Sequence, residues 1–440
     1  MKSSIFRHSW ILILAALNAQ AMGKKQNRAD PEIVCTRHMT PTLLPPSPTP
    51  SVQPGSPVQQ KPPMPGMGPT SVSTLSGPLD SVLFLFPTLT RYQLEEKFRN
   101  SSTDELMFFR ATAPLYYYLL SHSENELIAF TDVLKHTGVV MGDAHPENFG
   151  ALVINEQTVI YSANDVDDSA TRPYVLDLLR YFSAVRLLRP DADLAPLLDA
   201  YVAGISATPV SRTLRDSLIY DSQKKGLKVD KGDVDLTLFK FPRNPTEVFD
   251  APKEESRIYC GLALHHYSGT KCLDVAHVER RSGGSAFVPR TWVLIETPLG
   301  IRHVEFKTQY RSSTEAWGRN RILDTESAVR IEAGLNAFLG SARNREMQAI
   351  LSDGTSILMR PRYAGNGALK FSKLTPDQQL SLFAEQANTL GQIHVRTLNK
   401  KVTKRFLQDL KKVPIADWEK LSFKLIKEIR QWHQYTKSLP

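Results

Sequence analysis

The stretch Gly142-Asp143-Ala144-His145-Pro146-Glu147-Asn148-Phe149-Gly150, followed by Asn164-Asp165-Val166-Asp167-Asp168, decides how the fold of this sequence is interpreted. Short apolar runs precede both segments, at residues 139–141 and 158–161, and each run predicts a β-strand. Acidic and amide side chains are therefore expected directly after two neighbouring strands, where they can converge on one site.

The spacing of these polar residues suits metal-assisted phosphoryl transfer. Mg²⁺ prefers oxygen ligands and keeps waters and phosphates in its shell, so a few protein ligands suffice. We predict that Asn148, Asp165 and Asp167 bind the metal. Asp143 is the predicted catalytic base, placed where an acceptor hydroxyl loses its proton.

Three other interpretations of these residues stay open. Asp143 and His145 can simply satisfy backbone amides in a polar turn. Asp165, Asp167 and Asp168 can form a Ca²⁺ site, although no glycine or closing glutamate follows at the EF-hand offset. A metal-dependent hydrolase using Asp143, His145 and Asp165 is the third, and it predicts turnover that does not depend on nucleotide.

The sequence around these segments changes from helical to strand patterns and back. Helices are expected at 91–121, at 174–188, from Asp324-Thr325 to Phe338, and at 376–398. Strands are expected at 292–295, 301–306 and 356–359, with a turn at 298–300. Helices, then a sheet-rich unit, then helices indicate an α+β fold of two lobes.

The first 21 residues have the features of a secretory signal peptide. Lys2 and Arg7 form a basic start, Trp10 to Leu17 is apolar, and Ala19-Gln20-Ala21 is a small-x-small cleavage site. The apolar run is too short to span a bilayer. We therefore expect a protein without a transmembrane span that is exported to the periplasm or the extracellular space.

Residues 22–78 are expected to form a disordered linker. Pro41 to Pro69 contains 11 of the 29 prolines and no acidic residue. Proline removes amide donors and fixes extended backbone, so such a segment cannot bury a core. The folded part is expected to begin near Leu79.

Composition excludes several classes of protein. With 440 residues, 41% hydrophobic and 22% charged, the chain is neither collagen-like nor wholly disordered. Residues 400–440 carry 11 basic and 4 acidic side chains and hold most of the net charge of +9, so the main body is not a basic nucleic-acid surface. Three cysteines cannot support a disulfide scaffold, and Cys260 and Cys272 either pair with each other or stay free thiols.

The segment from Gly142 to Gly150 is similar to the catalytic loop of aminoglycoside phosphotransferases and protein-kinase-like enzymes, and Asp165 is similar to their metal-binding aspartate. Over residues 102–398 the chain resembles a bacterial family known only as domain of unknown function 2252, which has no agreed activity. The landmarks of that family occur in order: Phe108-Phe109-Arg110-Ala111-Thr112, Gly142 to Gly150, Asn164-Asp165-Val166-Asp167-Asp168, Asp177-Leu-Leu-Arg180, Gly284-Ser285, Lys307 and Leu390-Gly391-Gln392-Ile393-His394.

The order of these landmarks implies a permuted chain. In kinase-like proteins the glycine-rich loop and the phosphate-binding lysine come before the catalytic loop, whereas here Ser282 to Ser285 and Lys307 come after Asp143. The resemblance therefore implies a circularly permuted, two-lobed protein-kinase-like fold. Its parts would be a helical catalytic lobe at 79–250, a sheet-rich nucleotide lobe at 251–375, and C-terminal helices at 376–440.

The same resemblance assigns a nucleotide site and implies Mg²⁺ and ATP as cofactors. The backbone amides of Gly283, Gly284 and Ser285 would contact phosphates, and Lys307 would contact them as a point charge. Glu332, or alternatively Glu326, would orient that lysine. The assignment requires Lys307 to face Asp165.

Two positions depart from the family pattern, and Asp177 is expected to have a structural role. Phe287 stands where relatives have a glycine, and Met141 replaces the histidine usual before the Gly-Asp pair. Asp177 is expected to hold the Gly142–Gly150 loop through hydrogen bonds.

The function expected from these residues and the resemblance is that of an exported, Mg²⁺-dependent phosphotransferase-like enzyme. Its acceptor would be a hydroxyl of a small molecule or a protein, and no nucleic-acid partner is expected. The alternative is a non-catalytic kinase-like protein that binds a ligand or a metal.

Overall fold

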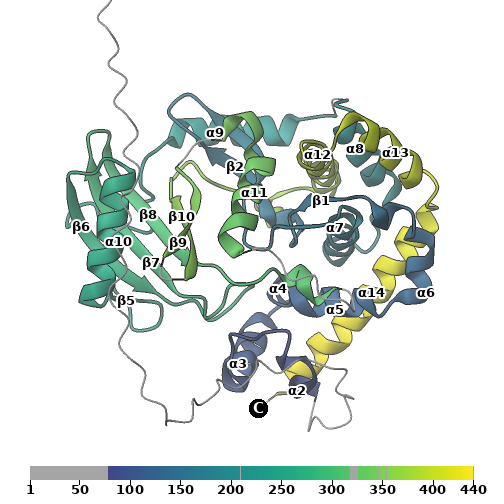
Figure 1. The fold of residues 1–440 in the computed structure, drawn as a ribbon, viewed down its shortest axis with the longest axis horizontal. Helices are drawn as coiled ribbons and strands as arrows, with labels where there is room; N and C mark the ends of the chain where they lie inside the picture. Colours follow the sequence, from purple (N-terminus) through teal and green to yellow (C-terminus); the bar gives the residue numbers. More distant parts are fainter. Residues whose placement is uncertain (1–77, 209, 318–325, 344–345, 353, 440) are drawn as a thin grey trace, which may run out of the picture. The chain divides into compact units, whose positions relative to one another are not determined.

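The computed structural model describes residues 78–439 except 209, 318–325, 344–345 and 353. The expected signal peptide at 1–21, the linker up to residue 77 and the helix start at Asp324-Thr325 lie outside the described residues. The described residues fall in one compact unit, Ser71–Pro440. They combine helices and strands, which confirms the predicted α+β class (Figure 1).

The described chain contains the following helices and strands. The helices are α2 (Pro78–Leu83), α3 (Arg91–Ser101), α4 (Glu105–Ala111), α5 (Ala113–Ser121), α6 (Glu124–Leu127), α7 (Val175–Leu188), α8 (Ala195–Ile205), α9 (Thr213–Lys225), α10 (Lys253–His266), α11 (Ser327–Leu339), α12 (Pro376–Val395), α13 (Lys400–Leu410) and α14 (Ile415–Lys437). The strands are β1 (Thr137–Val140), β2 (Phe149–Val153), β3 (Val159–Ala163), β4 (Ala170–Pro173), β5 (Val248–Asp250), β6 (Lys271–Val278), β7 (Arg290–Thr297), β8 (Gly300–Thr308), β9 (Gln348–Ser352) and β10 (Thr355–Pro361).

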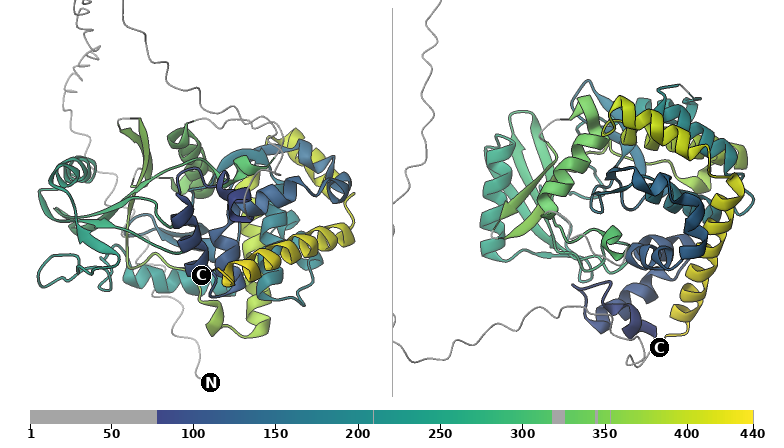
Figure 2. Two further views of the ribbon diagram at one scale, coloured as in Figure 1. Left: turned by 90° about the horizontal axis from the view of Figure 1, so that it is seen from below. Right: turned by 45° about the vertical axis from the view of Figure 1, so that its right-hand side comes forward.

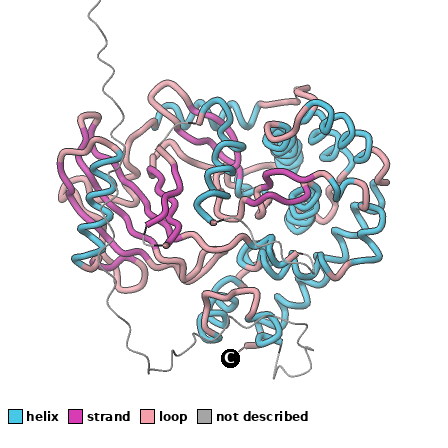
Figure 3. Tube along the Cα trace, viewed as in Figure 1, coloured by secondary structure: helices cyan, strands magenta, loops and turns pink. Residues whose placement is uncertain are grey.

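The strands form one large sheet and two small ones (Figure 3). The large sheet has the order β5-β6-β7-β8-β10-β9, and all its neighbouring strands are antiparallel. Helix α11 lies in the connection between β8 and β9. The small sheets are the pairs β1–β4 and β2–β3, which carry the residues on either side of the Asp143 loop.

The two faces of the large sheet differ in chemistry because side chains alternate along each strand. On one face, Val293, Ile295 and Phe306 pack with Ala263 of α10, the helix that covers this face in Figure 1. On the other face, Arg290 lies opposite Lys307 across the β7–β8 pair. The sheet therefore has an apolar face covered by a helix and a second face rich in charge.

The helices pack around a large apolar core. Helix α7 is buried from Val175 to Val185 and lies against the long helix α14, drawn in yellow in Figure 2. Helices α8 and α12 approach closely through glycines: a Cβ atom on Gly391 would lie 2.3 Å from the carbonyl oxygen of Tyr201. The helix predicted at 376–398 is confirmed in this core, ending at Val395.

Local sequence fixes several helix starts. Thr90 accepts a hydrogen bond from the backbone amide of Gln93, whose side chain accepts one from the amide of Thr90, so α3 begins with a capping box. Thr375 and Gln378 form the same arrangement at α12, with Pro376 in the first turn.

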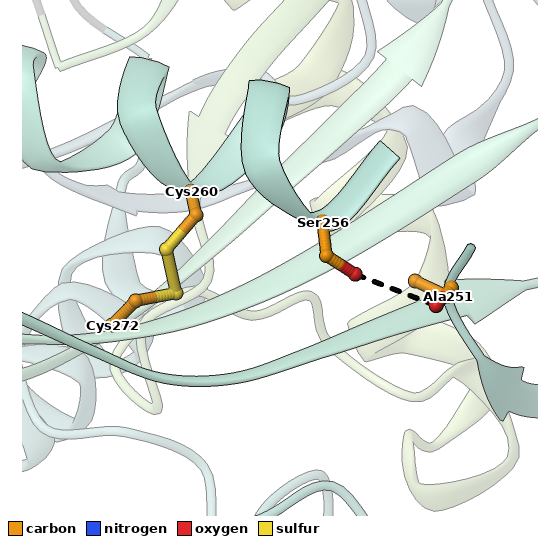
Figure 4. The surroundings of a disulfide bond; sticks show 4 residues. All are labelled: Ala251, Ser256, Cys260 and Cys272. Atoms are coloured by element: carbon orange, nitrogen blue, oxygen red, sulfur yellow. Dashed lines mark hydrogen bonds between the residues drawn. A yellow bond between two sulfur atoms is a disulfide. The ribbon is translucent and has the colours of Figure 1, made fainter. Parts of the chain in front are cut away.

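A disulfide joins Cys260 of α10 to Cys272 of β6, with the Cα atoms 6.0 Å apart (Figure 4). Of the two states left open by the sequence, the structure has the paired one. The bond fastens α10 to the apolar face of the sheet. Among the described residues, no helix is both long and apolar enough to cross a membrane, in agreement with the predicted lack of a transmembrane span.

Candidate functional site

The loop after β1 is held in place by Asp177 of α7. The Asp177 carboxylate accepts hydrogen bonds from the backbone amides of Met141, at 2.6 Å, and Gly142, at 2.9 Å. Gly142 has φ +74, and a Cβ atom there would lie 1.9 Å from the carbonyl oxygen of Asp168, so the position requires glycine. The structural role expected for Asp177 is confirmed by these contacts.

Asp143 is half of a buried ion pair. Arg180 Nε donates to Asp143 Oδ1 at 2.7 Å, and Nε2 of His145 lies 3.6 Å from the other carboxylate oxygen. Burial alone raises the pKa of Asp143, but the opposing charge of Arg180 and the His145 contact outweigh it, and the pKa lies below its ordinary value. Asp143 is therefore a carboxylate whose proton affinity is weak.

Arg180 is placed by aromatic packing. Its guanidinium carbon lies 4.2 Å from the centre of the Phe109 ring and 5.0 Å from that of Tyr116. Planar arginine stacks well on aromatic faces, and its fork suits a carboxylate. The Phe108-Phe109-Arg110 segment noted in the sequence thus helps to fix the partner of Asp143.

Asn148 lies at the end of a short 3₁₀ turn, Pro146–Asn148. Its side-chain nitrogen donates to the carbonyl oxygen of Asp143 at 3.0 Å, which leaves the side-chain oxygen available as a ligand. Asp165 follows β3, and its carboxylate accepts a hydrogen bond from the amide of Asp167 at 3.2 Å. Asn148 precedes β2 and Asp165 follows β3, so both residues lie at the open end of the β2–β3 hairpin.

Lys307 of β8 reaches the same loop from the sheet. It is 2% exposed, and its ammonium group forms an ion pair with Asp167. Burial lowers the pKa of Lys307 to about 8, while the charge of Asp165 opposes that shift. Lys307 is therefore joined to the segment that follows β3 through Asp167, two residues after Asp165.

Two arginines of the sheet share this environment. Burial lowers the pKa of Arg290 of β7, whereas the pKa of Arg360 of β10 is raised because the charge of Glu305 outweighs burial. Both arginines pair with Glu305, and Lys307 on the strand between them pairs with Asp167. Such an arrangement can hold a polyanion together with a divalent cation.

Gly283, Gly284 and Ser285 lie in the connection between β6 and β7. The Gly283 amide donates to Ser101 Oγ at 3.2 Å, and the side chain of Ser285 accepts from Arg290. Of the three backbone amides predicted to contact phosphates, that of Gly283 thus already bonds within the chain.

Phe287, which stands where a glycine was expected, has φ +61. An L side chain rarely adopts this left-handed conformation, and glycine adopts it without strain. The backbone at this position thus keeps a glycine-like geometry despite the larger residue.

The carboxylate that pairs with Lys307 differs from the one expected. Glu332 of α11 accepts hydrogen bonds from Arg343 at 2.9 Å and from the amide of Ala349, so its charge is directed to the β9 side of the helix. Glu326 is the residue before α11 begins. The partner of Lys307 in the structure is Asp167, which the sequence had assigned to the metal.

Lys97 is a charged residue of the site that the sequence reasoning missed. It belongs to α3, is 2% exposed, and donates to the carbonyl oxygens of Gly283, at 2.9 Å, and Gly284, at 2.5 Å. Burial lowers its pKa to about 7; the charge of Asp168 opposes this. The only sequence signal was a lysine inside an amphipathic helix, a pattern that normally indicates a solvated side chain.

Within the described part of the chain, no three His, Cys, Asp or Glu side chains are grouped so that they could hold a metal ion. The predicted site needs two carboxylates and the Asn148 amide, so that finding does not exclude it. Of the two carboxylates predicted as ligands, Asp167 pairs with Lys307, and Asp165 accepts a hydrogen bond from the amide of Asp167.

Comparison with known proteins places part of this site in a family. A family model described as an uncharacterized protein conserved in bacteria (DUF2252) matches residues 91–195. Residues 91–195 are similar to that family. This similarity confirms the resemblance drawn from the sequence, and the DUF2252 segment includes Lys97, Asp143, Asn148 and Asp165. No curated protein and no solved structure matches the chain.

The DUF2252 segment ends before the sheet that carries Lys307.

A separate groove of about 510 Å³ lies along α12 and α13 and is lined by apolar residues and by Lys400, Lys404 and Lys411. It contains no carboxylate among its lining residues, so we place the candidate site at the Asp143 loop, where acid, base and amide groups converge.

Proposed function

We propose that this chain is an exported, Mg²⁺-dependent phosphotransferase-like enzyme that transfers a phosphoryl group to a hydroxyl acceptor. One observation carries the proposal: Lys307, from a strand of the large sheet, pairs with Asp167. Asp167 lies two residues after Asp165, in the segment that follows the Asp143 loop in the sequence. A phosphate-binding lysine, metal-binding oxygens and a carboxylate near the acceptor are the groups that phosphoryl transfer needs.

The topology supports a two-lobed kinase-like arrangement in permuted order. The glycine-containing connection joins β6 to β7, Lys307 lies on the next strand β8, and α11 follows before β9 and β10. Protein kinases likewise place a glycine-rich loop before the strand with the lysine and a helix after it. The Asp143 loop precedes all of these elements, which is the permuted order that the sequence implies.

In the proposed reaction, the acceptor oxygen bonds to the terminal phosphorus of the donor as the bridging P–O bond breaks. The electron pair of that bond leaves with the shortened donor, ADP if the donor is ATP. The acceptor proton would pass by way of Asp143 to solvent. Asn148 and Asp165 would hold Mg²⁺, which would supply charge neutralisation for the phosphates. Because the pKa of Asp143 is low, its main contribution would be orientation of the hydroxyl.

Thermal unfolding with and without Mg²⁺ and a phosphate donor tests the proposal. ATP, the donor that the resemblance implies, and inorganic tripolyphosphate are titrated separately. A bound donor at a hundred times its Kd stabilises the folded state by about 2.7 kcal/mol. We expect a Mg²⁺-dependent rise in Tm that disappears in Asp165→Asn; a folded protein that responds to neither donor contradicts the proposal.

A non-catalytic ligand-binding protein is the second candidate. It is favoured by the contacts of Gly283 and Gly284, whose polar groups already bond to Ser101 and Lys97. A donor that stabilises the chain without being consumed, in the presence of a broad set of hydroxyl acceptors and of water, is the outcome this candidate predicts.

A further inference from the structure

The sheet face beside Lys307 carries a buried ion cluster. Glu305, two residues before Lys307 on β8, is 0% exposed and accepts hydrogen bonds from Arg360 at 2.8 Å and Trp292 at 3.1 Å. Arg290 and Arg362 also donate to it, each at 3.4 Å. A nucleobase needs an apolar slot with a few polar contacts. Beside Lys307 this face instead carries the charged Glu305 cluster, with Arg290 opposite Lys307 on β7 and the buried Leu358 opposite it on β10.

The remainder of this face is covered by the chain itself. Val229, Val234 and Phe241 pack with Trp292 and Leu294 in one buried cluster, and the Phe241 and Trp292 rings lie 5.5 Å apart. These residues come from the segment between α9 and β5. The apolar part of the sheet face, where a flat ring would stack, is therefore already filled.

The backbone amides that follow β10 also have hydrogen-bond partners within the protein. The amide of Arg362 donates to His303, that of Ala364 to Lys228, that of Gly365 to Gly226, and that of Gly367 to Ala151, all through backbone carbonyls. Bases are commonly recognised through backbone amides and carbonyls at the edge of a pocket. Here these groups already bond within the protein.

Cationic groups lie beside the Asp165 loop. Lys307 pairs with Asp167 of that loop, and Arg290 lies opposite Lys307 across the β7–β8 pair. Nε of Arg290, a residue that is 2% exposed, has no hydrogen-bond partner among the described residues. Guanidinium and ammonium groups at this density recognise phosphate oxygens rather than a neutral base.

We propose that the phosphoryl donor of this site is an inorganic polyphosphate, bound with Mg²⁺ between Lys307 and the Asp165 loop, and not a nucleotide. The inference rests on the proposed phosphotransferase function and replaces its ATP. The acceptor oxygen bonds to the terminal phosphorus, the adjacent bridging P–O bond breaks, and its electron pair leaves on a polyphosphate shortened by one unit. The acceptor proton passes through Asp143 to solvent.

Calorimetric titration of the full chain with Mg²⁺ and tripolyphosphate, ATP or AMP tests this inference. Tripolyphosphate has the three phosphates of ATP without the nucleoside. Because the surface that would receive the base is filled, we expect tripolyphosphate to bind about tenfold more tightly than ATP, and AMP not to compete with it. ATP binding as tightly as tripolyphosphate, or more tightly, overturns the inference while leaving the phosphotransferase proposal intact.

Two variants and a control locate the binding. Lys307→Met should weaken tripolyphosphate binding by tenfold or more, and Asp165→Asn should remove its dependence on Mg²⁺. Lys224→Met, at a lysine whose side chain is 59% exposed, should leave binding unchanged. Equal affinity in Lys307→Met and Lys224→Met overturns the inference, and a folded chain that binds neither donor overturns the proposed function with it.

Discussion

His394 of α12 and Asp177 of α7 are 217 positions apart in sequence, yet Nε2 of His394 lies 3.0 Å from Oδ2 of Asp177. The other ring nitrogen of His394 lies 2.8 Å from the hydroxyl of Tyr201. Since Asp177 also accepts from the amides of Met141 and Gly142, a helix near the C-terminus is coupled to the loop that carries Asp143. Helix α12 therefore belongs to the support of the candidate site.

Asp177→Asn should destabilise the protein. The change removes a fully buried carboxylate that accepts hydrogen bonds from two backbone amides and contacts His394. Hydrogen bonds to a charged group contribute about 1.5–3 kcal/mol each, so we expect a loss of roughly 3 kcal/mol in the free energy of unfolding. Urea denaturation measures it.

The matched control is Asp216→Asn in α9, where the aspartate side chain is 64% exposed. It should change the free energy of unfolding by less than about 0.5 kcal/mol. If Asp177→Asn and Asp216→Asn unfold at the same urea concentration, Asp177 does not hold the loop.

Gly391→Ala should destabilise the helix pair α8–α12. The added methyl group would lie 2.3 Å from the carbonyl oxygen of Tyr201, which is backbone and cannot rotate away. Forcing atoms into a close-packed crossing costs about 1–3 kcal/mol or more. The measurement is the shift of Tm relative to the unchanged chain.

Gly261 of α10 is the control for the helical glycine, because no atom lies within 4 Å of a Cβ placed there. Gly261→Ala should stabilise the protein by about 0.5–1 kcal/mol through helix propensity. The same sign of Tm shift in both variants would show that the α8–α12 crossing is looser than described.

Lys97 should make stability depend on pH. Burial lowers its pKa to about 7, so the folded state releases a proton that the unfolded chain keeps until about pH 10.5. Between these values the unfolded state binds more protons, and stability rises with pH by up to about 1.4 kcal/mol per unit. Below pH 7 Lys97 is protonated in both states, and the folded state then bears the full free-energy cost of burying its charge.

The test compares the unchanged chain with Lys97→Met from pH 7 to pH 9. As pH rises, the unchanged chain should gain free energy of unfolding relative to Lys97→Met. Relative to Lys224→Met it should show no such gain. Parallel curves for the unchanged chain and Lys97→Met would mean that Lys97 titrates normally.

The sequence predicted most of the regular structure because hydrophobic periodicity is local. The helix expected at 174–188 is observed at Val175–Leu188, and the strand expected at 301–306 is observed at Gly300–Thr308. The Asp143 loop was found for a similar reason: its polar residues follow short strands within one continuous stretch. These features need no knowledge of distant contacts.

The partners of the charged residues could not be predicted in the same way. Lys307 pairs with Asp167 rather than Glu332, and the Glu332 carboxylate bonds instead to Arg343 and to the Ala349 amide of β9. The residues next to Glu305 in the sequence do not indicate that Arg290, Arg360 and Arg362 surround it. Such pairings depend on which strands become neighbours, and local patterns do not encode that.

Variants of Asp143 and Arg180 separate the contribution of this ion pair to stability from the contribution of Asp143 to the proposed reaction. Arg180 is fully buried, and its only charged partner among the described residues is Asp143. Removing one member of a buried pair leaves an uncompensated charge or polar group, which costs about 3–5 kcal/mol. We therefore expect Asp143→Asn and Arg180→Met each to lower the free energy of unfolding by roughly 3 kcal/mol.

The double variant Asp143→Asn/Arg180→Met should lose less than the sum of the single changes, because neither charge is then left unpaired. A double-mutant cycle by urea denaturation gives the coupling energy, expected at about 1–3 kcal/mol. Strict additivity would mean that the pair contributes no stability in solution. Donor binding should survive in Asp143→Asn, since Lys307 and Asp165 remain, whereas transfer to an acceptor should be lost; unchanged transfer would remove Asp143 from the proposed chemistry.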